Sequence, residues 1–421
     1  MQAVIALPNR DKLGGLLSPS SPLLRRVCGV PLIARVIATA ARSGVTEVLL
    51  IGNGSDAEII LDVSSPYLKS PSREFIQVIP TQNFNPASGA SWKAISVQLE
   101  SELIWIPWNW VTYPHALSDL SFSGGRPQSW SVPVRMLRSE LIGDELDPVS
   151  ISINPQGVAV GSEAALIQAE RFLVKHSGKR LDGIHSKFNR WLCRPFVEVL
   201  ARTRVTPNAV TLAGLCLAVA SASFFARGTY LNAVAGALFF FMSGLADDAD
   251  GMLARIKFAD SSFGCWFEGF VDNASYVLLF LGVTLGLSAQ GYRPALLLGG
   301  LSLLGCSISI AVIALQRRKA TLPDHPNEYL GKVYGLLEHD SGSFISQVTR
   351  QVHFLTKKGV LIHYVLLFTL LGWLPLMLWL VLIGSHLTWI ITLYLDHRFF
   401  KPAHIALMGK TLENEKGGRI Q

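Results

Sequence analysis

Six apolar stretches in the second half of the chain limit its possible folds more than any other feature. They cover about 209–226, 229–246, 264–287, 294–315, 359–372 and 374–395. A helix needs roughly 20 apolar residues to cross the hydrocarbon core, and only the fifth stretch is clearly short of that length. No comparable stretch occurs before about Ala169. The sequence therefore predicts a soluble first half, followed from near residue 185 by an all-α membrane part with six transmembrane helices.

Composition excludes several other classes of protein. Half of the residues are hydrophobic and 16% are charged, against about 25% charged residues in soluble domains. The five cysteines form no CxxC pair, so we expect neither a zinc site nor a disulfide framework. Disordered, collagen-like and disulfide-stapled proteins are ruled out by these values.

The position of the positive charge indicates topology. The net charge is +7, and many basic residues gather in 316–358, whereas the opposite loops carry little beyond Arg227 and Arg293. Basic loops stay on the cytoplasmic side, so both termini are predicted to be cytoplasmic in a multi-pass protein of the cell (inner) membrane. Charge next to a membrane favours anionic lipids or phosphate-bearing substrates as partners, and we expect no nucleic-acid partner.

A basic amphipathic segment precedes the first predicted span. Residues 189–204 alternate four arginines with Trp191, Leu192, Phe196, Val199 and Leu200. A helix of this kind suits the membrane surface. The alternative is an ordinary helix that packs on the soluble part.

The first half has the pattern of an α/β domain. Residues 3–7 and 45–52 are apolar strand candidates, and 31–41 between them is apolar at helical spacing. Strand, helix and strand with a short turn at Ser43-Gly44 predict a βαβ unit of a parallel, Rossmann-like sheet. Further strand candidates are 75–79, 103–106 and 158–160.

Acidic residues cluster between the second and third predicted spans. Asp247 and Asp250 are three residues apart and Glu268 and Asp272 are four apart, so each pair shares one helix face. Carboxylates near membrane depth normally face partners or cavities. If the two faces oppose each other, a divalent cation would relieve the repulsion, and oxygen ligands favour Mg²⁺ or Mn²⁺.

Two neighbouring residues suggest what such a cation would serve. Gly251 allows a phosphate to approach the backbone, and the Arg255 guanidinium can bind phosphate oxygens in a fork. A metal, an arginine and a spare carboxylate base together indicate phosphoryl transfer.

These residues follow a spaced signature, Asp-x2-Asp-Gly-x2-Ala-Arg-x8-Gly-x3-Glu-x3-Asp, over 247–272. The signature resembles that of the CDP-alcohol phosphotransferases, which have Asp where this chain has Glu268. The resemblance extends upstream to Asp182-Gly183, Asn189-Arg190 and the segment 206–211, and covers roughly 180–397.

The resemblance implies roles for individual residues. Asp247, Asp250, Glu268 and Asp272 would hold the metal, and Asp272 would also deprotonate the acceptor hydroxyl. The CDP site would be lined by Gly251, Arg255 and Gly264, with Asn208 and Thr211 near cytidine. An alcohol would attack the phosphate of a CDP-alcohol and release CMP, in a homodimer. We expect CDP-diacylglycerol as donor, and therefore a role in phospholipid biosynthesis.

The first half resembles sugar-nucleotide nucleotidyltransferases over about 1–165. The resemblance rests on 3–7, 21–24, 29–33 and 44–48. The glycine-rich loop expected after the first strand is replaced by residues 8–15, which lack the early glycines. The two family lysines are replaced by Ser21 and Val30, and the metal-binding Asp is replaced near Asn109. We therefore expect an inactive nucleotidyltransferase-like domain.

The combination leaves alternatives open. Fused domains of these two kinds resemble the bifunctional enzymes that make CDP-inositol and then di-inositol phosphate phosphate, so CDP-inositol is the alternative donor. A degenerate membrane scaffold is a further alternative, because Glu268 departs from the signature. A cation transporter is disfavoured, because the carboxylates lie at one edge of the spans rather than mid-membrane.

The predicted organisation has four parts, with bounds at 1–170, 171–205, 206–397 and 398–421. They are the nucleotidyltransferase-like domain, a linker with the interfacial helix, the phosphotransferase domain and a cytoplasmic tail. Outside the signature, Asp248 and Asp260 are interpreted as solvated loop charges. Lys257 and the basic residues of 316–358 are interpreted either as binding an acceptor phosphate or as topology-setting charge.

Overall fold

The computed structural model describes residues 1–8, 21–68, 75–81, 83–122, 127, 129–142, 156–178, 183–320 and 358–399. The chain forms two compact units. The first comprises Met1–Arg180, Arg194–Thr206 and Met252–Ala259, and the second comprises Leu181–Cys193, Pro207–Gly251 and Asp260–Gln421.

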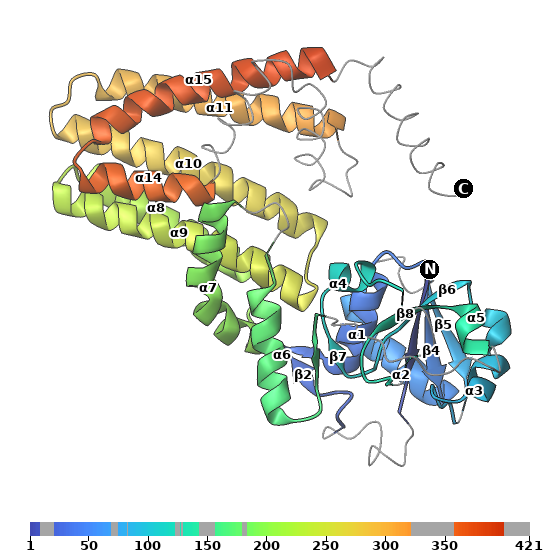
Figure 1. Cartoon of the computed structure of the whole chain (residues 1–421). Helices are drawn as coiled ribbons and strands as arrows, with labels where there is room; N and C mark the ends of the chain where they lie inside the picture. The colour runs from blue at the N-terminus through green and yellow to red at the C-terminus, as the bar shows by residue number, and fades with distance from the viewer. Residues whose placement is uncertain are drawn as a thin grey trace. The chain divides into compact units, whose positions relative to one another are not determined.

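A five-stranded sheet forms the centre of the first unit. Its strands are β1 (Gln2–Ala6), β4 (Glu47–Gly52), β5 (Ile76–Pro80), β6 (Glu102–Trp105) and β8 (Val134–Leu137), in the order β5-β4-β1-β6-β8 (Figure 1). All neighbours run parallel except β8, which is antiparallel to β6. Strand β1 is at the centre of the sheet: β4 and β5 are added on one side of it, and β6 and β8 on the other.

Both faces of the sheet are buried, which explains the continuous apolar runs in the central strands. Side chains alternate between faces along a strand. Ile5 and Leu50 accordingly belong to the core cluster that contains residues of α1 (Leu32–Ala41) and α2 (Gly54–Ser64). Val4 and Leu49 belong to a second cluster, with Trp92 of α3 (Gly89–Ala94) and Trp105.

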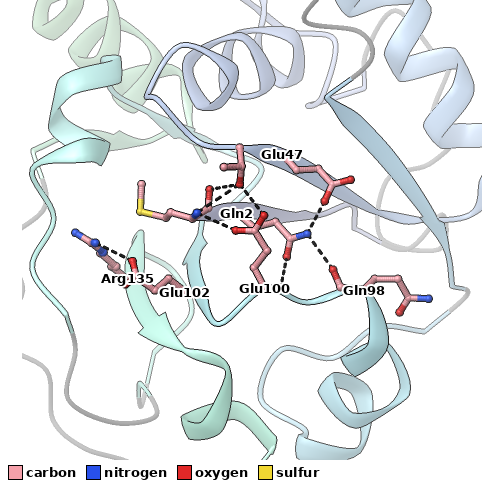
Figure 2. A network of polar contacts seen from close by, with 8 residues as sticks. Gln2, Glu47, Gln98, Glu100, Glu102 and Arg135 are labelled. Carbon is pink, nitrogen blue, oxygen red and sulfur yellow. Dashed lines mark hydrogen bonds and ion pairs between the residues drawn. The ribbon is translucent and has the colours of Figure 1, made fainter. Parts of the chain in front are cut away.

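Polar contacts tie together the amino ends of the central strands (Figure 2). The Gln2 amide donates to Glu47 Oε2 at 2.7 Å and to the Gln98 carbonyl at 2.9 Å. Gln2 is fully buried, so these bonds satisfy groups that burial would otherwise leave unpaired. Arg135 Nη2 on β8 lies 3.0 Å from Glu102 Oε2 on β6.

Shorter elements complete this unit. They are β2 (Arg26–Val27), β3 (Val30–Pro31), η2 (Ser65–Tyr67), η3 (Ser96–Gln98), β7 (Trp110–Val111), α4 (Pro114–Ser118), α5 (Arg138–Ile142), β9 (Val158–Ala159) and α6 (Glu163–Lys175).

The expected α/β region with a parallel sheet is confirmed. The strand expected at 158–160 exists as β9 but pairs with β7 outside the main sheet. The edge strand β8 was not expected. The finer Rossmann-like and nucleotidyltransferase-like assignments stay predictions.

The helical part follows with α7 (Ile184–Arg202), α8 (Pro207–Ala226), α9 (Tyr230–Lys257), α10 (Ser262–Ala289), α11 (Ala295–Ala320), α14 (Lys358–Leu370) and α15 (Leu374–Phe399). Among the described residues, five helices are long and apolar enough to span a membrane: α8, α9, α10, α11 and α15. The other predicted span corresponds to α14, whose 13 residues rise only about 20 Å against a core of about 30 Å. The chain is thus a membrane protein, and six spans remain a prediction.

Helices α8 and α10 approach each other through small residues. A Cβ added at Gly282 on α10 would lie 2.6 Å from the carbonyl oxygen and 2.8 Å from the Cα of Ala222 on α8. Gly286, one turn further, also faces the α8 backbone at Phe225. The spacing Gly282-x3-Gly286 is that of close helix pairs in membranes.

Helix α7 has the exposed apolar face expected of an interfacial helix. Trp191, Phe196 and Val199 are each more than half exposed. Asn189 and Val197 of the same helix are fully buried. The predicted helix is confirmed, although it begins at Ile184 and continues through Pro195.

Candidate active site

The four signature carboxylates lie on two helices of the second unit. Asp247 and Asp250 are on α9, and Glu268 and Asp272 are on α10. Asp250 is only 3% exposed and lies close enough to the other three carboxylates to interact with them electrostatically. The two pairs therefore converge. The spacing along each helix predicted that each pair shares one face, and the structure brings the two faces together.

A lysine lies among these carboxylates. Lys358 Nζ is 2.7 Å from Asp272 Oδ1 and 3.8 Å from Asp247 Oδ1. The Lys358 side chain is only 5% exposed. In the sequence, Lys358 is one of the basic residues of 316–358, which are interpreted as acceptor-binding or topology-setting charge. Its burial contradicts a role as a solvated topology-setting charge, because a buried ammonium requires ionic partners.

The residues expected near cytidine also meet the acidic site. The Thr211 hydroxyl on α8 lies 2.5 Å from Asp250 Oδ2, in a buried contact. Asn208, at the start of α8, has its Oδ1 3.3 Å from where a Cβ at Gly264 would lie. Helix α8 therefore brings both of its candidate residues to the carboxylates and to the first turn of α10.

Asn189 of α7 joins α9 to the start of α14. Its Nδ2 donates to Asp248 Oδ2 at 3.0 Å and to the Gly359 carbonyl at 3.1 Å. The glycine permits this approach, because a Cβ at Gly359 would lie 3.2 Å from the same Asn189 nitrogen. Lys358 is the residue before Gly359, so the Asn189 contacts fix the backbone that carries the lysine.

Asp248 is not the solvated loop charge that the sequence analysis expected. It lies within α9, its side chain is 13% exposed, and its Oδ1 is 3.6 Å from Arg190 Nε. Burial lowers the pKa of Arg190, and the Asp248 carboxylate opposes that change. Asn189-Arg190 belongs to the family resemblance, and no local signal in the sequence links either residue to Asp248.

The C-terminal turns of α9 belong to the first unit, and two cations there contact backbone. Arg255 Nε donates to the Ser177 carbonyl at 2.6 Å. Lys257 Nζ lies 2.8 to 3.2 Å from the carbonyls of Leu200, Thr203 and Val205. These three carbonyls match the three donors of the ammonium. Lys257 is therefore not free to bind an acceptor phosphate in this structure, contrary to one of its two interpretations from the sequence. Arg255 and Gly251 lie on the same helix as the two α9 carboxylates.

The chemistry of the donors fits a divalent cation. Hard oxygen ligands and an excess of negative charge are what Mg²⁺ and Mn²⁺ prefer. In the described part of the chain, no group of three or more His, Cys, Asp or Glu side chains has an arrangement that could hold a metal ion. The Lys358 ammonium instead bridges Asp247 and Asp272.

In the first unit, two positions where the nucleotidyltransferases have lysines are buried. Ser21 is 2% exposed, and Val30 packs in an apolar cluster with Ala34, Ala38 and Phe258. Asn109 Nδ2 lies 3.5 Å from the Val160 carbonyl. Most of the loop at 8–15, Asp182, the basic residues of 321–357 and the tail from 400 lie outside the described residues.

Comparison with known proteins addresses the helical part. Residues 204–337 match the family described as CDP-alcohol phosphatidyltransferase. An uncharacterised protein of Aquifex aeolicus is 34% identical over 146 residues, which are 34% of this chain and 66% of that protein. Archaetidylinositol phosphate synthase of Methanothermobacter thermautotrophicus is 30% identical over 98 residues, 23% of this chain and 49% of that protein. The chain thus spans 66% or less of either relative.

The matched region contains the whole acidic signature, from Asp247 to Asp272, and the helices α8 to α11 that position it. Lys358, which contacts that signature, lies beyond the match. The part of the chain that contains the acidic signature is thus similar to the CDP-alcohol phosphatidyltransferase family.

Proposed function

We propose that this protein transfers a phosphoalcohol group from a CDP-linked lipid to an acceptor alcohol and releases CMP. CDP-diacylglycerol is the proposed donor, and phospholipid biosynthesis the proposed process. The convergence of Asp247, Asp250, Glu268 and Asp272 between α9 and α10 is the observation that carries the proposal. The name of the archaeal relative, archaetidylinositol phosphate synthase, supports a lipid product.

The proposed roles follow the acidic site. Asp247, Asp250 and Glu268 would hold Mg²⁺ or Mn²⁺, with Asp272 adjoining. The cation would stabilise negative charge on the phosphates. Asp272 accepts the proton of the attacking hydroxyl, and the oxygen–phosphorus bond to CMP breaks as the new phosphodiester forms. Thr211 holds the Asp250 carboxylate through its 2.5 Å contact.

The proposed donor site lies where the start of α8 meets the first turn of α10. Asn208 and Gly264 lie against each other, which supports a shared cytidine-binding surface with Thr211. Gly251 and Arg255 continue along α9 toward the cytoplasmic end in the proposed topology, where a phosphate can approach the backbone. A homodimer with both termini in the cytoplasm is part of the same proposal.

The soluble domain is proposed to be nucleotidyltransferase-like and inactive, with a role in stability, regulation or substrate delivery. The buried Ser21 and Val30 support this, because neither position offers a cation to a triphosphate. CMP transfer from CTP by the full chain, with inositol phosphate as acceptor, would contradict it.

The test is CMP release by the full chain in lipid nanodiscs. CDP-diacylglycerol and Mg²⁺ are supplied with a panel of alcohols that includes inositol and inositol phosphate. We expect CMP release with one acceptor, and its loss in Asp272→Asn while the variant elutes as the folded protein. CDP-inositol is supplied as donor in a parallel reaction, and CMP release only in that reaction would favour the di-inositol phosphate alternative. If neither donor yields CMP with any acceptor, the scaffold alternative remains.

Glu268 supplies a second test of the same proposal. We propose that a small shift of α10 accommodates the extra methylene, so Glu268→Asp should change the rate of CMP release only modestly. If the wild-type protein releases no CMP and the Glu268→Asp variant does, the proposed activity of this chain is wrong.

A further inference from the structure

The end of α9 carries a residue that does not suit its backbone conformation. Phe258 directly follows the last residue of the helix and has a positive φ of 54°. The Ala259 amide donates to the Ala254 carbonyl at 2.9 Å, which is the bond that closes a Schellman motif, and the left-handed residue of that motif is usually glycine. A bulky residue in the left-handed region is strained, and such strain persists only where surrounding contacts hold it.

Contacts from α1 hold Phe258 in this conformation. The Cζ atoms of Arg35 and Arg42 lie 5.1 and 4.6 Å from the centre of the Phe258 ring, within the range of cation–π attraction. Arg42 Nη2 also donates to the Phe258 carbonyl at 3.3 Å. The ring is buried and packs with Ala34 and Ala38. These contacts explain why a phenylalanine occupies a position that favours glycine.

The residues just before Phe258 are held as well. Lys257 Nζ contacts three carbonyls of the segment 200–205, and Arg255 Nε donates to the Ser177 carbonyl. All of these partners belong to the first unit, as does the end of α9 itself. Phe258 lies three residues after Arg255, which is about one helical turn. The contacts of Phe258 therefore fix the turn that carries Arg255.

We propose that Phe258 is a positioning residue that holds Arg255 in the orientation that binds the phosphates of a CDP-linked donor. The α/β part of the chain then acts through α1, whose two arginines hold the Phe258 ring. This inference rests on the proposed function, because Arg255 is assigned to the donor there. It gives the α/β part a specific role, which is to fix the last turn of α9.

The test compares Phe258→Gly with the wild-type protein, each as the full chain in lipid nanodiscs. Glycine adopts the left-handed conformation without strain, so the substitution keeps the end of α9 and removes the ring. We expect the KM for CDP-diacylglycerol to rise about tenfold, because a charge-assisted contact to the donor is weakened. The kcat should change less than about threefold, since the contact is lost from the ground state and the transition state alike. The Kd for CDP, measured by isothermal titration calorimetry, should rise about as much as the KM.

Phe122→Gly is the matched control. Arg135 Cζ lies 4.2 Å from the centre of the Phe122 ring, so this variant also loses a ring that contacts an arginine, but at the edge of the sheet. Its KM and its Kd for CDP should equal those of the wild type. If Phe258→Gly does not fold, Arg42→Met decides the question. That variant keeps the Phe258 ring but loses one of its cations, and it should raise both constants at least about threefold.

Unchanged constants in a folded Phe258→Gly, or in Arg42→Met where Phe258→Gly does not fold, would overturn the inference. So would a fall in kcat with the KM and the Kd for CDP unchanged, because Phe258 would then act on a step other than donor binding. If Phe122→Gly weakens CDP binding as much as Phe258→Gly, the effect is not specific to the end of α9 and the inference is wrong.

Binding of CDP separates this inference from the proposed function. If the wild-type protein releases CMP but Phe258→Gly changes neither constant, the inference fails and the proposed function stands. If no CDP-alcohol yields CMP, yet the wild-type protein binds CDP and Phe258→Gly weakens that binding, the proposed function fails while the positioning role of Phe258 holds.

Discussion

Asn189→Asp is the substitution that most directly tests the contacts around α14. It keeps the shape of the side chain but replaces the amide donor with a carboxylate. The new oxygen would face Asp248 Oδ2 at about 3.0 Å and the Gly359 carbonyl at about 3.1 Å, so an acceptor would replace the donor that both of these oxygens now share. Asn189 is fully buried, and water cannot relieve the repulsion.

The expected cost follows from the pKa of the introduced acid. Burial beside a like charge raises a carboxyl pKa by roughly 3 above its unfolded value of about 3.9, which corresponds to about 4 kcal/mol of lost stability. The folded state then holds a proton that the unfolded state releases. The free energy of unfolding of the variant therefore falls, relative to the wild type, as pH rises from about 4 toward 7, and the loss is complete above the folded-state pKa.

The assay is thermal unfolding in detergent micelles at pH 5 and pH 8, followed by tryptophan fluorescence. Asn232→Asp is the matched control. Asn232 lies in the first turn of α9, where a negative charge is favourable, so that variant should unfold near the wild-type temperature at both pH values. If the two variants unfold alike, or if Asn189→Asp shows no loss between pH 5 and pH 8, the reasoning about these contacts is wrong.

Two further predictions concern packing and burial. Gly282→Ala should destabilise the protein by about 1–3 kcal/mol, because its Cβ would lie 2.6 Å from a backbone oxygen of α8, whereas Gly384→Ala, which meets nothing within 4 Å, should not lower the unfolding temperature. Burial raises the pKa of Cys28 to about 11 and that of Cys193 to about 12. Both should therefore stay protonated and resist iodoacetamide at pH 8, while the half-buried Cys265 reacts. Mass spectrometry locates the modified cysteines, and labelling of Cys28 or Cys193 before unfolding would contradict their burial.

Features that are encoded locally can be predicted from the residues alone. Helix and strand periodicity is read within one segment, so the βαβ unit and the long apolar helices could be predicted from the printed residues. The acidic site could be predicted for the same reason. The spacing of Asp247 to Asp250 and of Glu268 to Asp272 places each pair on one face, and only the convergence of the two faces needed the structure.

The roles of Lys358, Asp248 and Lys257 depend on contacts that form in the folded chain. Their partners lie far away in sequence: Asn189 contacts Gly359 across 170 residues, and Lys358 contacts Asp272 across 86. The residues next to a lysine or aspartate in the sequence do not show whether its side chain is exposed to solvent or buried. No local pattern therefore distinguishes a charge at the membrane flank from a buried ion pair. Burial and partner decide that difference, because the cost of desolvating a charge depends on what the fold brings to it.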